Sequence, residues 1–220
     1  MRRRLPYAKM SRTDLALIAA LAVLSVAPTL HVAAYARTKA AAELKSAYVL
    51  NWGADVWALQ AAIRSGDLFN PEFLRMFSYG FLHTGSAHLV YNLVHLIPLW
   101  WITVRRMGGV WTVAIYLAGL VLSCLLHLIS TPPGPITIGA SGGVHFLFGL
   151  WAVWAFQDRV GSMFRRAWPS LLILTFVVSD NLFLISKFGS RFAWDLHLWG
   201  FVAGLFVARL LPKRATLLSH

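Results

Sequence analysis

The sequence has few charged side chains and almost no cysteine. Only 13% of the 220 residues are charged and 58% are hydrophobic, whereas soluble domains average about 25% charged residues. A soluble chain of this length has too small an interior to bury so much apolar surface, so an integral membrane protein is predicted. The single cysteine, Cys124, excludes an intramolecular disulfide framework and any multi-cysteine metal site.

Acidic residues are also scarce, since 8 Asp and Glu stand against 20 Lys and Arg, for a formal net charge of +12. Single-stranded nucleic acids bind in basic grooves that also carry stacking aromatic side chains. Here the basic residues lie mostly at the ends of apolar runs, and the tryptophans lie within or beside those runs. We therefore expect the lipid bilayer as a partner and no nucleic acid.

Six apolar runs are long enough to cross a bilayer as helices. They cover about 15–35, 81–104, 110–129, 139–156, 168–185 and 194–211. The only long hydrophilic stretch, 37–80, is too rich in tryptophan, leucine and phenylalanine for a solvated tether, so part of it is expected to rest in the outer membrane interface. The predicted fold is all-α, a single six-span membrane domain over residues 1–220.

The distribution of Lys and Arg predicts the orientation of these spans. If the N-terminus is cytoplasmic, the inner segments carry about twice as many basic residues as the outer loops. We therefore expect both termini in the cytoplasm and the start of the 139–156 span on the outer side. The expected location is a prokaryotic cell (inner) membrane.

The second predicted span carries polar residues at membrane depth, where they are costly. His88, Asn92 and His95 are spaced i, i+4 and i+7 and so share one helical face. The stripe fits either interhelical hydrogen bonding or a set of donors for a reaction. A metal site is not expected, because no His-Glu-x-x-His motif or carboxylate pair completes a ligand set. His31 and His127, near the ends of other runs, are expected to be interfacial.

The fourth predicted span opens with a serine between glycines. Gly139 and Gly142 leave the Ser141 hydroxyl uncrowded and allow the backbone to approach closely. A helix that starts there directs unpaired N–H groups at whatever lies beside the serine, which is what a developing oxyanion needs. The same pattern also fits a helix-packing motif, and both interpretations stay open on this motif alone.

The sixth predicted span carries His197, Gly200 and Gly204 on one face, at i, i+3 and i+7. The glycines let another helix come close on the side to which the imidazole points. If that helix is the fourth span, Ser141 and His197 form a nucleophile and its general base. Asp195 lies two residues from His197 and so points elsewhere, and no third member of a triad is expected.

Together these motifs resemble the rhomboid family of intramembrane serine proteases. The resemblance covers roughly residues 70–204 and the six-span core. It rests on four features in the expected order: Arg75 with Phe81-Leu-His83, His88-x-x-x-Asn92, Gly139-Ala-Ser141-Gly, and His197-x-x-Gly200-x-x-x-Gly204.

The resemblance implies a catalytic dyad without a carboxylate. Ser141 matches the family nucleophile and His197 its base. His88 and Asn92 match the side chains that line the oxyanion site together with the Ser141 backbone N–H. No cofactor is implied.

Other matched positions line the active site or permit close packing. His83 matches a residue beside the active-site cavity, and Gly139 and Gly142 flank the nucleophile within it. Gly200 and Gly204 match helix-packing positions. Rhomboids cleave transmembrane segments of other proteins with a dyad that is open to water from the outer side, so a transmembrane protein substrate is the implied partner.

Three departures from the family pattern mark a divergent branch. His145 stands where the family often has a tyrosine, four residues after Ser141, and is expected to pack against the dyad without replacing His197 as base. Leu74-Arg75 stands in place of a Trp-Arg pair, and Arg105-Arg106 occupies the region where a glutamate is often found. These departures are expected to affect substrate preference more than the catalytic chemistry.

Three functions are compatible with polar residues inside a membrane protein. The first is an active serine endopeptidase. The second is a catalytically silent rhomboid-like protein that binds membrane clients through the same groove, although such relatives usually lose a dyad residue and this chain keeps both. A transporter or channel would require paired carboxylates or broken-helix repeats, and neither is present. The sequence names no substrate and leaves the oligomeric state open.

Overall fold

The computed structural model describes residues 10–35, 38–130, 136–157 and 193–211, with isolated positions between 171 and 182. These residues are largely helical, and one isolated antiparallel bridge joins Ala54 to Thr137. The elements are α1 (Arg12–Ala34), α2 (Lys39–Trp52), α3 (Val56–Ser65), α4 (Glu72–Ser78), the 3₁₀ turn η1 (Tyr79–Phe81), α5 (Ser86–Met107), α6 (Gly109–Ser130), α7 (Ser141–Gln157) and α9 (Trp194–Leu210).

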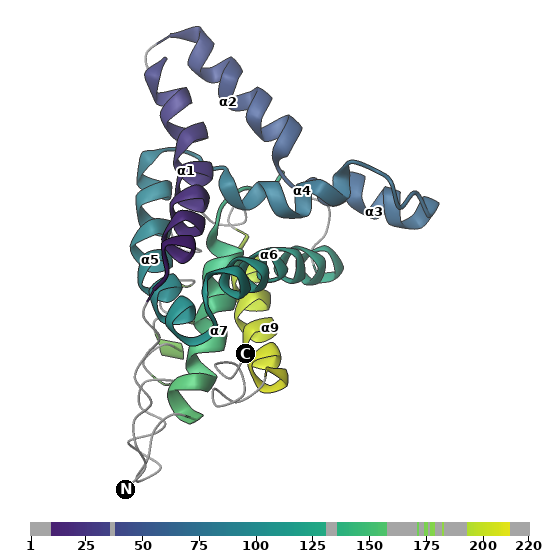
Figure 1. Cartoon of the computed structure of the whole chain (residues 1–220). Helices are drawn as coiled ribbons and strands as arrows, with labels where there is room; N and C mark the ends of the chain where they lie inside the picture. Colours follow the sequence, from purple (N-terminus) through teal and green to yellow (C-terminus); the bar gives the residue numbers. More distant parts are fainter. Residues whose placement is uncertain are drawn as a thin grey trace, which may run out of the picture.

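Three of these helices, α1, α5 and α6, are long and apolar enough to cross a membrane. Two shorter helices of 17 residues each, α7 and α9, occupy the fourth and sixth predicted spans, with ends within two residues of the predicted ones. The fifth predicted span, 168–185, lies outside the described residues except at isolated positions. The described architecture is a helical membrane bundle (Figure 1).

The second span begins later than its apolar run indicates. The run starts at Phe81, but α5 begins at Ser86, after the short turn η1 and an extended segment through Leu82. Leu82 and His83 are buried although they are not helical, so the hydrophobic run continues where the helix does not. Hydropathy reports burial from water rather than backbone conformation, and the predicted start at residue 81 is therefore wrong by five residues.

Helix α7 lies at the centre of the bundle, where it packs against α5, α6 and α9 (Figure 1). Every residue from Ser141 to Leu150 is buried. Close packing against α9 depends on glycine: a Cβ added at Gly149 would overlap the Phe201 carbonyl oxygen, and one added at Gly204 would overlap that of Phe146. The two helix backbones therefore touch, which small residues permit in membrane helices.

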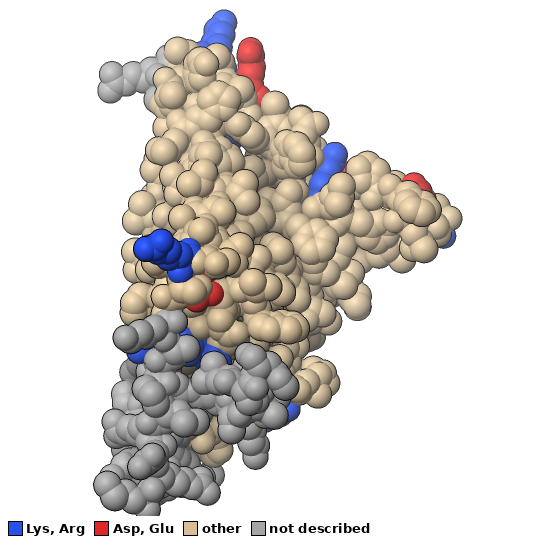
Figure 2. All heavy atoms as spheres, in the orientation of Figure 1, with Lys and Arg blue, Asp and Glu red and all other residues tan. Residues whose placement is uncertain are grey.

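The 38–80 segment folds into α2, α3 and α4 instead of an open loop, and α3 projects from the side of the bundle (Figure 1). Several of its apolar side chains are exposed, and Phe69, after α3, is 99% exposed. On the face shown in Figure 2, charged side chains are few and lie at the top, along the projection to the right and on the left at mid-height, with a largely uncharged surface between them. This arrangement is typical of a surface that faces lipid.

Helix α4 holds a buried acid, Glu72, whose Oε1 lies 2.8 Å from Arg75 Nη1. Among the described residues its Oε2 has no hydrogen-bond partner. Burial raises the pKa of Glu72; Arg75 opposes this shift and Asp55 adds to it. A carboxyl whose pKa is higher in the folded state favours folding below its unfolded pKa, and this contribution is lost as pH rises through the folded pKa.

We therefore expect Glu72→Gln to raise the melting temperature in detergent at about pH 8, where the buried carboxylate is ionised. The gain should shrink as the pH is lowered and wild-type Glu72 becomes protonated, which its raised pKa brings about at a higher pH than for an ordinary Glu. Thermal unfolding of both proteins at decreasing pH measures the effect. A wild type that is more stable than the variant at about pH 8 would contradict the prediction.

Candidate active site

The Ser141 hydroxyl and the His88 imidazole both lie near Gly139, just before the start of α7. Gly139 has φ +130°, a conformation that side chains rarely adopt, and its N–H donates to the Tyr79 carbonyl at 2.9 Å. A Cβ at Gly139 would lie 2.9 Å from the His88 ring and 3.7 Å from Ser141 Oγ. Glycine is thus required here both for its backbone conformation and for the space between the two side chains.

Thr84 orients the His88 ring by contacts to its Nδ1 atom. The Thr84 backbone N–H donates to His88 Nδ1 at 3.4 Å, and the Thr84 hydroxyl lies 3.2 Å from the same atom. Because Nδ1 accepts from the backbone, the proton of the neutral ring is on Nε2. A Cβ added at Gly139 would lie 3.1 Å from Nε2, so this edge of the ring borders Gly139, two residues before Ser141.

His145 links the serine to His197. It lies one turn after Ser141, and its Nδ1–H donates to the Ser141 carbonyl at 2.8 Å. Its ring stacks on the His197 ring with centroids 4.1 Å apart and planes 19° apart. The imidazole of α9 is therefore in contact with the first turn of α7.

Two glycines bring the backbones together beside this stack. A Cβ at Gly200, one turn after His197, would lie 2.5 Å from the carbonyl oxygen of Gly142 and 2.9 Å from Ser123 Oγ. A Cβ at Gly142 would lie 2.8 Å from the Tyr79 hydroxyl. The structure thus places Ser141 and His197 on adjacent turns of two helices in backbone contact.

Tyr79 and Ser123 are site residues that sequence reasoning did not identify. The Ser123 hydroxyl is 3.1 Å from the Gly142 carbonyl oxygen and 2.6 Å from that of Gly119 in its own helix. The Tyr79 hydroxyl donates to the Leu120 carbonyl at 3.0 Å. Ser123 therefore holds the 139–143 segment through its hydroxyl, and Tyr79 holds it through the backbone carbonyl that accepts from the Gly139 N–H. A lone serine and a lone tyrosine in apolar surroundings give no motif by which to find them.

The remaining predicted residues lie around this centre. Asn92, which is 2% exposed, donates through Nδ2 to the His88 carbonyl at 3.0 Å. His95 donates to the Tyr91 carbonyl at 2.8 Å and contacts Phe148, two turns beyond His88 along α5. Gly204 lies one turn beyond Gly200 along α9, where it packs against α7 away from the dyad.

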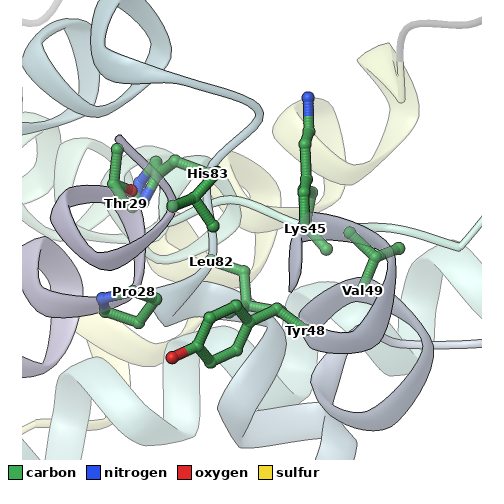
Figure 3. A pocket seen from close by; sticks show the side chains of 9 residues that line it. Pro28, Thr29, Lys45, Tyr48, Val49, Leu82 and His83 are labelled. Carbon is green, nitrogen blue, oxygen red and sulfur yellow. The ribbon is translucent and has the colours of Figure 1, made fainter. Parts of the chain in front are cut away.

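His83, expected beside the active-site cavity, lies against the His88 ring. The two rings meet edge to face with centroids 5.2 Å apart. His83 also lines a small pocket of about 10 Å³ between α1 and α2, together with Thr29, Lys45 and Tyr48 (Figure 3). Burial lowers the pKa of His83 to about 4, so a neutral ring packs against His88.

His127, expected near the membrane interface, is buried between helices. The residue is 4% exposed, and its Nδ1 lies 2.6 Å from Asp195 Oδ2 on α9. Asp195 therefore faces α6 and not His197. His31, by contrast, is exposed and pairs with the Tyr48 hydroxyl at 2.7 Å. Within the described ranges, no three His, Cys, Asp or Glu side chains are close enough to hold a metal ion.

The fold is that of a helical membrane protein in which α7, with Ser141, and α9, with His197, are in backbone contact at the centre. The Rhomboid domain family model matches residues 70–214, and the chain belongs to the rhomboid family. It is similar to Rhomboid-related protein 2 of Mus musculus, with 28% identity over 148 residues, which are 62% of this chain and 47% of the mouse protein. The matched region thus spans about half of that relative.

Proposed function

We propose that this chain is an intramembrane serine endopeptidase that cleaves transmembrane segments of other membrane proteins with a Ser141–His197 dyad. The observation that carries the proposal is the convergence at the start of α7. The His88 ring and the Ser141 hydroxyl both border Gly139, while His197 stacks on His145, one turn after Ser141 in α7.

The proposed reaction has two steps, acylation of Ser141 and hydrolysis of the acyl-enzyme. Ser141 Oγ attacks a peptide carbonyl while His197 takes the hydroxyl proton, and the same imidazole then returns that proton to the leaving amine. An acyl-enzyme forms on Ser141, and a water activated by His197 hydrolyses it to release a carboxylate. No cofactor is required by any of these steps.

Three donors are proposed for the oxyanion. They are the Ser141 backbone N–H, which has no helical acceptor at the start of α7, the His88 Nε2–H and the Asn92 amide. Removing one such donor typically lowers kcat by about 10²–10³-fold. Asn92 now donates within its own helix, and this bond has to be exchanged for one to the oxyanion, as hydrogen bonds in substrate-free sites commonly are.

His145 serves as a platform for His197 in this proposal and not as a second base. Its Nδ1–H is engaged by the Ser141 carbonyl. The parallel rings place its face, rather than a ring nitrogen, against His197. Stacking of this kind limits rotation of the His197 ring, which is the role that an aromatic residue at this position is expected to fill.

The membrane placement is proposed from the same arrangement. The chain is a single six-span domain of a prokaryotic cell membrane, with both termini cytoplasmic. The basic residues at the end of α5 lie at the opposite end of the bundle from Ser141, so the dyad opens toward the outer side. The exposed apolar side chains of the 38–80 segment then rest in the outer interface.

The test is labelling of detergent-solubilised protein with a fluorophosphonate probe, which modifies nucleophilic serines. Wild type should be labelled, and Ser141→Ala and His197→Ala should not. Ser25→Ala removes another buried serine, whose hydroxyl donates to the Leu21 carbonyl in α1, and should be labelled like wild type.

A smaller sulfonyl fluoride, used in parallel, controls for access to the site. If neither probe labels folded wild type, the protease proposal fails and the client-binding interpretation is favoured. Labelling that persists in Ser141→Ala would show that another residue is the nucleophile.

A further inference from the structure

The first turn of α9 contains a buried carboxylate that the proposed reaction does not use. Asp195 is 8% exposed and lies two residues before His197. Its Oδ2 accepts from His127 Nδ1 at 2.6 Å and from the Ser130 hydroxyl at 3.2 Å. Both donors are in the last turn of α6. Burying a carboxylate is costly unless donors satisfy it, and this end of α6 supplies two.

A second contact holds the same helix face. The indole Nε1–H of Trp199 donates to the Ser130 hydroxyl at 2.6 Å. Asp195 and Trp199 are spaced i, i+4 and therefore share a face, whereas His197 lies midway between them on the opposite side of the helix. The end of α6 is thus hydrogen-bonded to α9 on the side that faces away from Ser141.

This geometry sets the rotation of α9 about its own axis. A helix held at positions two residues before and two residues after His197 directs the His197 ring to the opposite side, where His145 and Ser141 lie. The contacts to Ser130 and His127 act within one turn of the imidazole, so a small rotation of that turn moves the ring directly.

We propose that Asp195 is a positioning residue, which through His127 and Ser130 fixes the angle at which α9 presents His197 to Ser141. The inference rests on the proposed endopeptidase function for its consequence in rate. A misplacement of about 1 Å costs up to about 10²-fold in rate, so the loss of this anchor should appear in kcat and not in substrate binding.

The test compares two carboxylates that each join a pair of helices. Asp195→Ala should lower kcat for a fluorogenic transmembrane-segment substrate by about 10- to 100-fold, with KM changed by less than about threefold. Asp14 joins α1 to α6 at the other end of the bundle, where its Oδ1 accepts from the Gly109 N–H at 2.6 Å. Asp14→Ala should lower the melting temperature and leave kcat unchanged.

Two further variants separate positioning from general stability. His127→Ala should lower kcat in the direction that Asp195→Ala does, and the double variant should be no worse than Asp195→Ala alone, because Asp195→Ala already removes the contact with His127. His127→Asn keeps a donor near Nδ1 and should restore part of the rate. If Asp195→Ala loses stability to the same extent as Asp14→Ala and keeps its full kcat, the residue is only structural and the proposal is wrong.

A measurement that needs no activity separates this inference from the proposed function. In ¹⁵N-histidine NMR spectra, the His197 ring signals should shift in folded Asp195→Ala and stay in place in Asp14→Ala. Unmoved His197 signals in Asp195→Ala would overturn the positioning role even if wild type cleaves. An inactive wild type whose His197 signals do shift would instead remove only the protease proposal.

Discussion

His197→Ala is expected to lower kcat for transmembrane-segment cleavage by about 10⁴- to 10⁶-fold, whereas His145→Ala should lower it by only about tenfold. Loss of the base removes proton transfer from Ser141 altogether. Loss of His145 removes a stacking face at 4.1 Å and leaves His197 chemically intact. The difference arises because the Nδ1–H of His145 is already committed to the Ser141 carbonyl.

The control keeps an aromatic ring at the stacking position. His145→Tyr should retain most of the wild-type kcat, since a phenol ring presents a similar face to His197 but has no imidazole nitrogen. Steady-state kinetics on one fluorogenic substrate compare all three variants. Cleavage that survives His197→Ala and disappears in both His145 variants would show that His145 is the base.

The helices that carry the site could be predicted from sequence, because their signals are local. The 17-residue helices α7 and α9 follow the apolar runs that contain Ser141 and His197. The i, i+3, i+7 spacing of His197, Gly200 and Gly204 indicated a close helix partner on the imidazole side. The structure places that partner at α7, where Gly200 faces the Gly142 carbonyl.

The features that sequence reasoning missed depend on how separate helices are aligned. Nothing in the α6 sequence shows that His127 meets Asp195, since 68 residues separate them and only the relative height and rotation of α6 and α9 bring them together. Tyr79 is in a 3₁₀ turn at the end of the 37–80 stretch, and its contact with the 139–143 segment could not be foreseen for the same reason.

Gly204→Val is expected to lower the free energy of unfolding by about 3 kcal/mol or more and to abolish measurable cleavage. A Cβ at this position would overlap the Phe146 carbonyl oxygen and lie 3.0 Å from Gly149 Cα and from Leu150 N. All three are backbone atoms of α7, which cannot rotate away as a flexible side chain can. The two helices would have to separate along their contact.

Separation of α7 from α9 couples stability to activity in this molecule, because one helix carries Ser141 and the other His197. Val202→Ile provides a matched control: it adds a methylene to the same helix at a position that is 39% exposed, and it should leave both melting temperature and kcat near wild type. Gly204→Ala should fall between the two, since it adds the clashing Cβ without the two γ-methyl groups. Thermal unfolding and cleavage rates measured on the same preparations provide the test.

A Gly204→Val protein with wild-type stability would mean that α7 and α9 are not in backbone contact. The proposed pairing of Ser141 with His197 would then need another explanation.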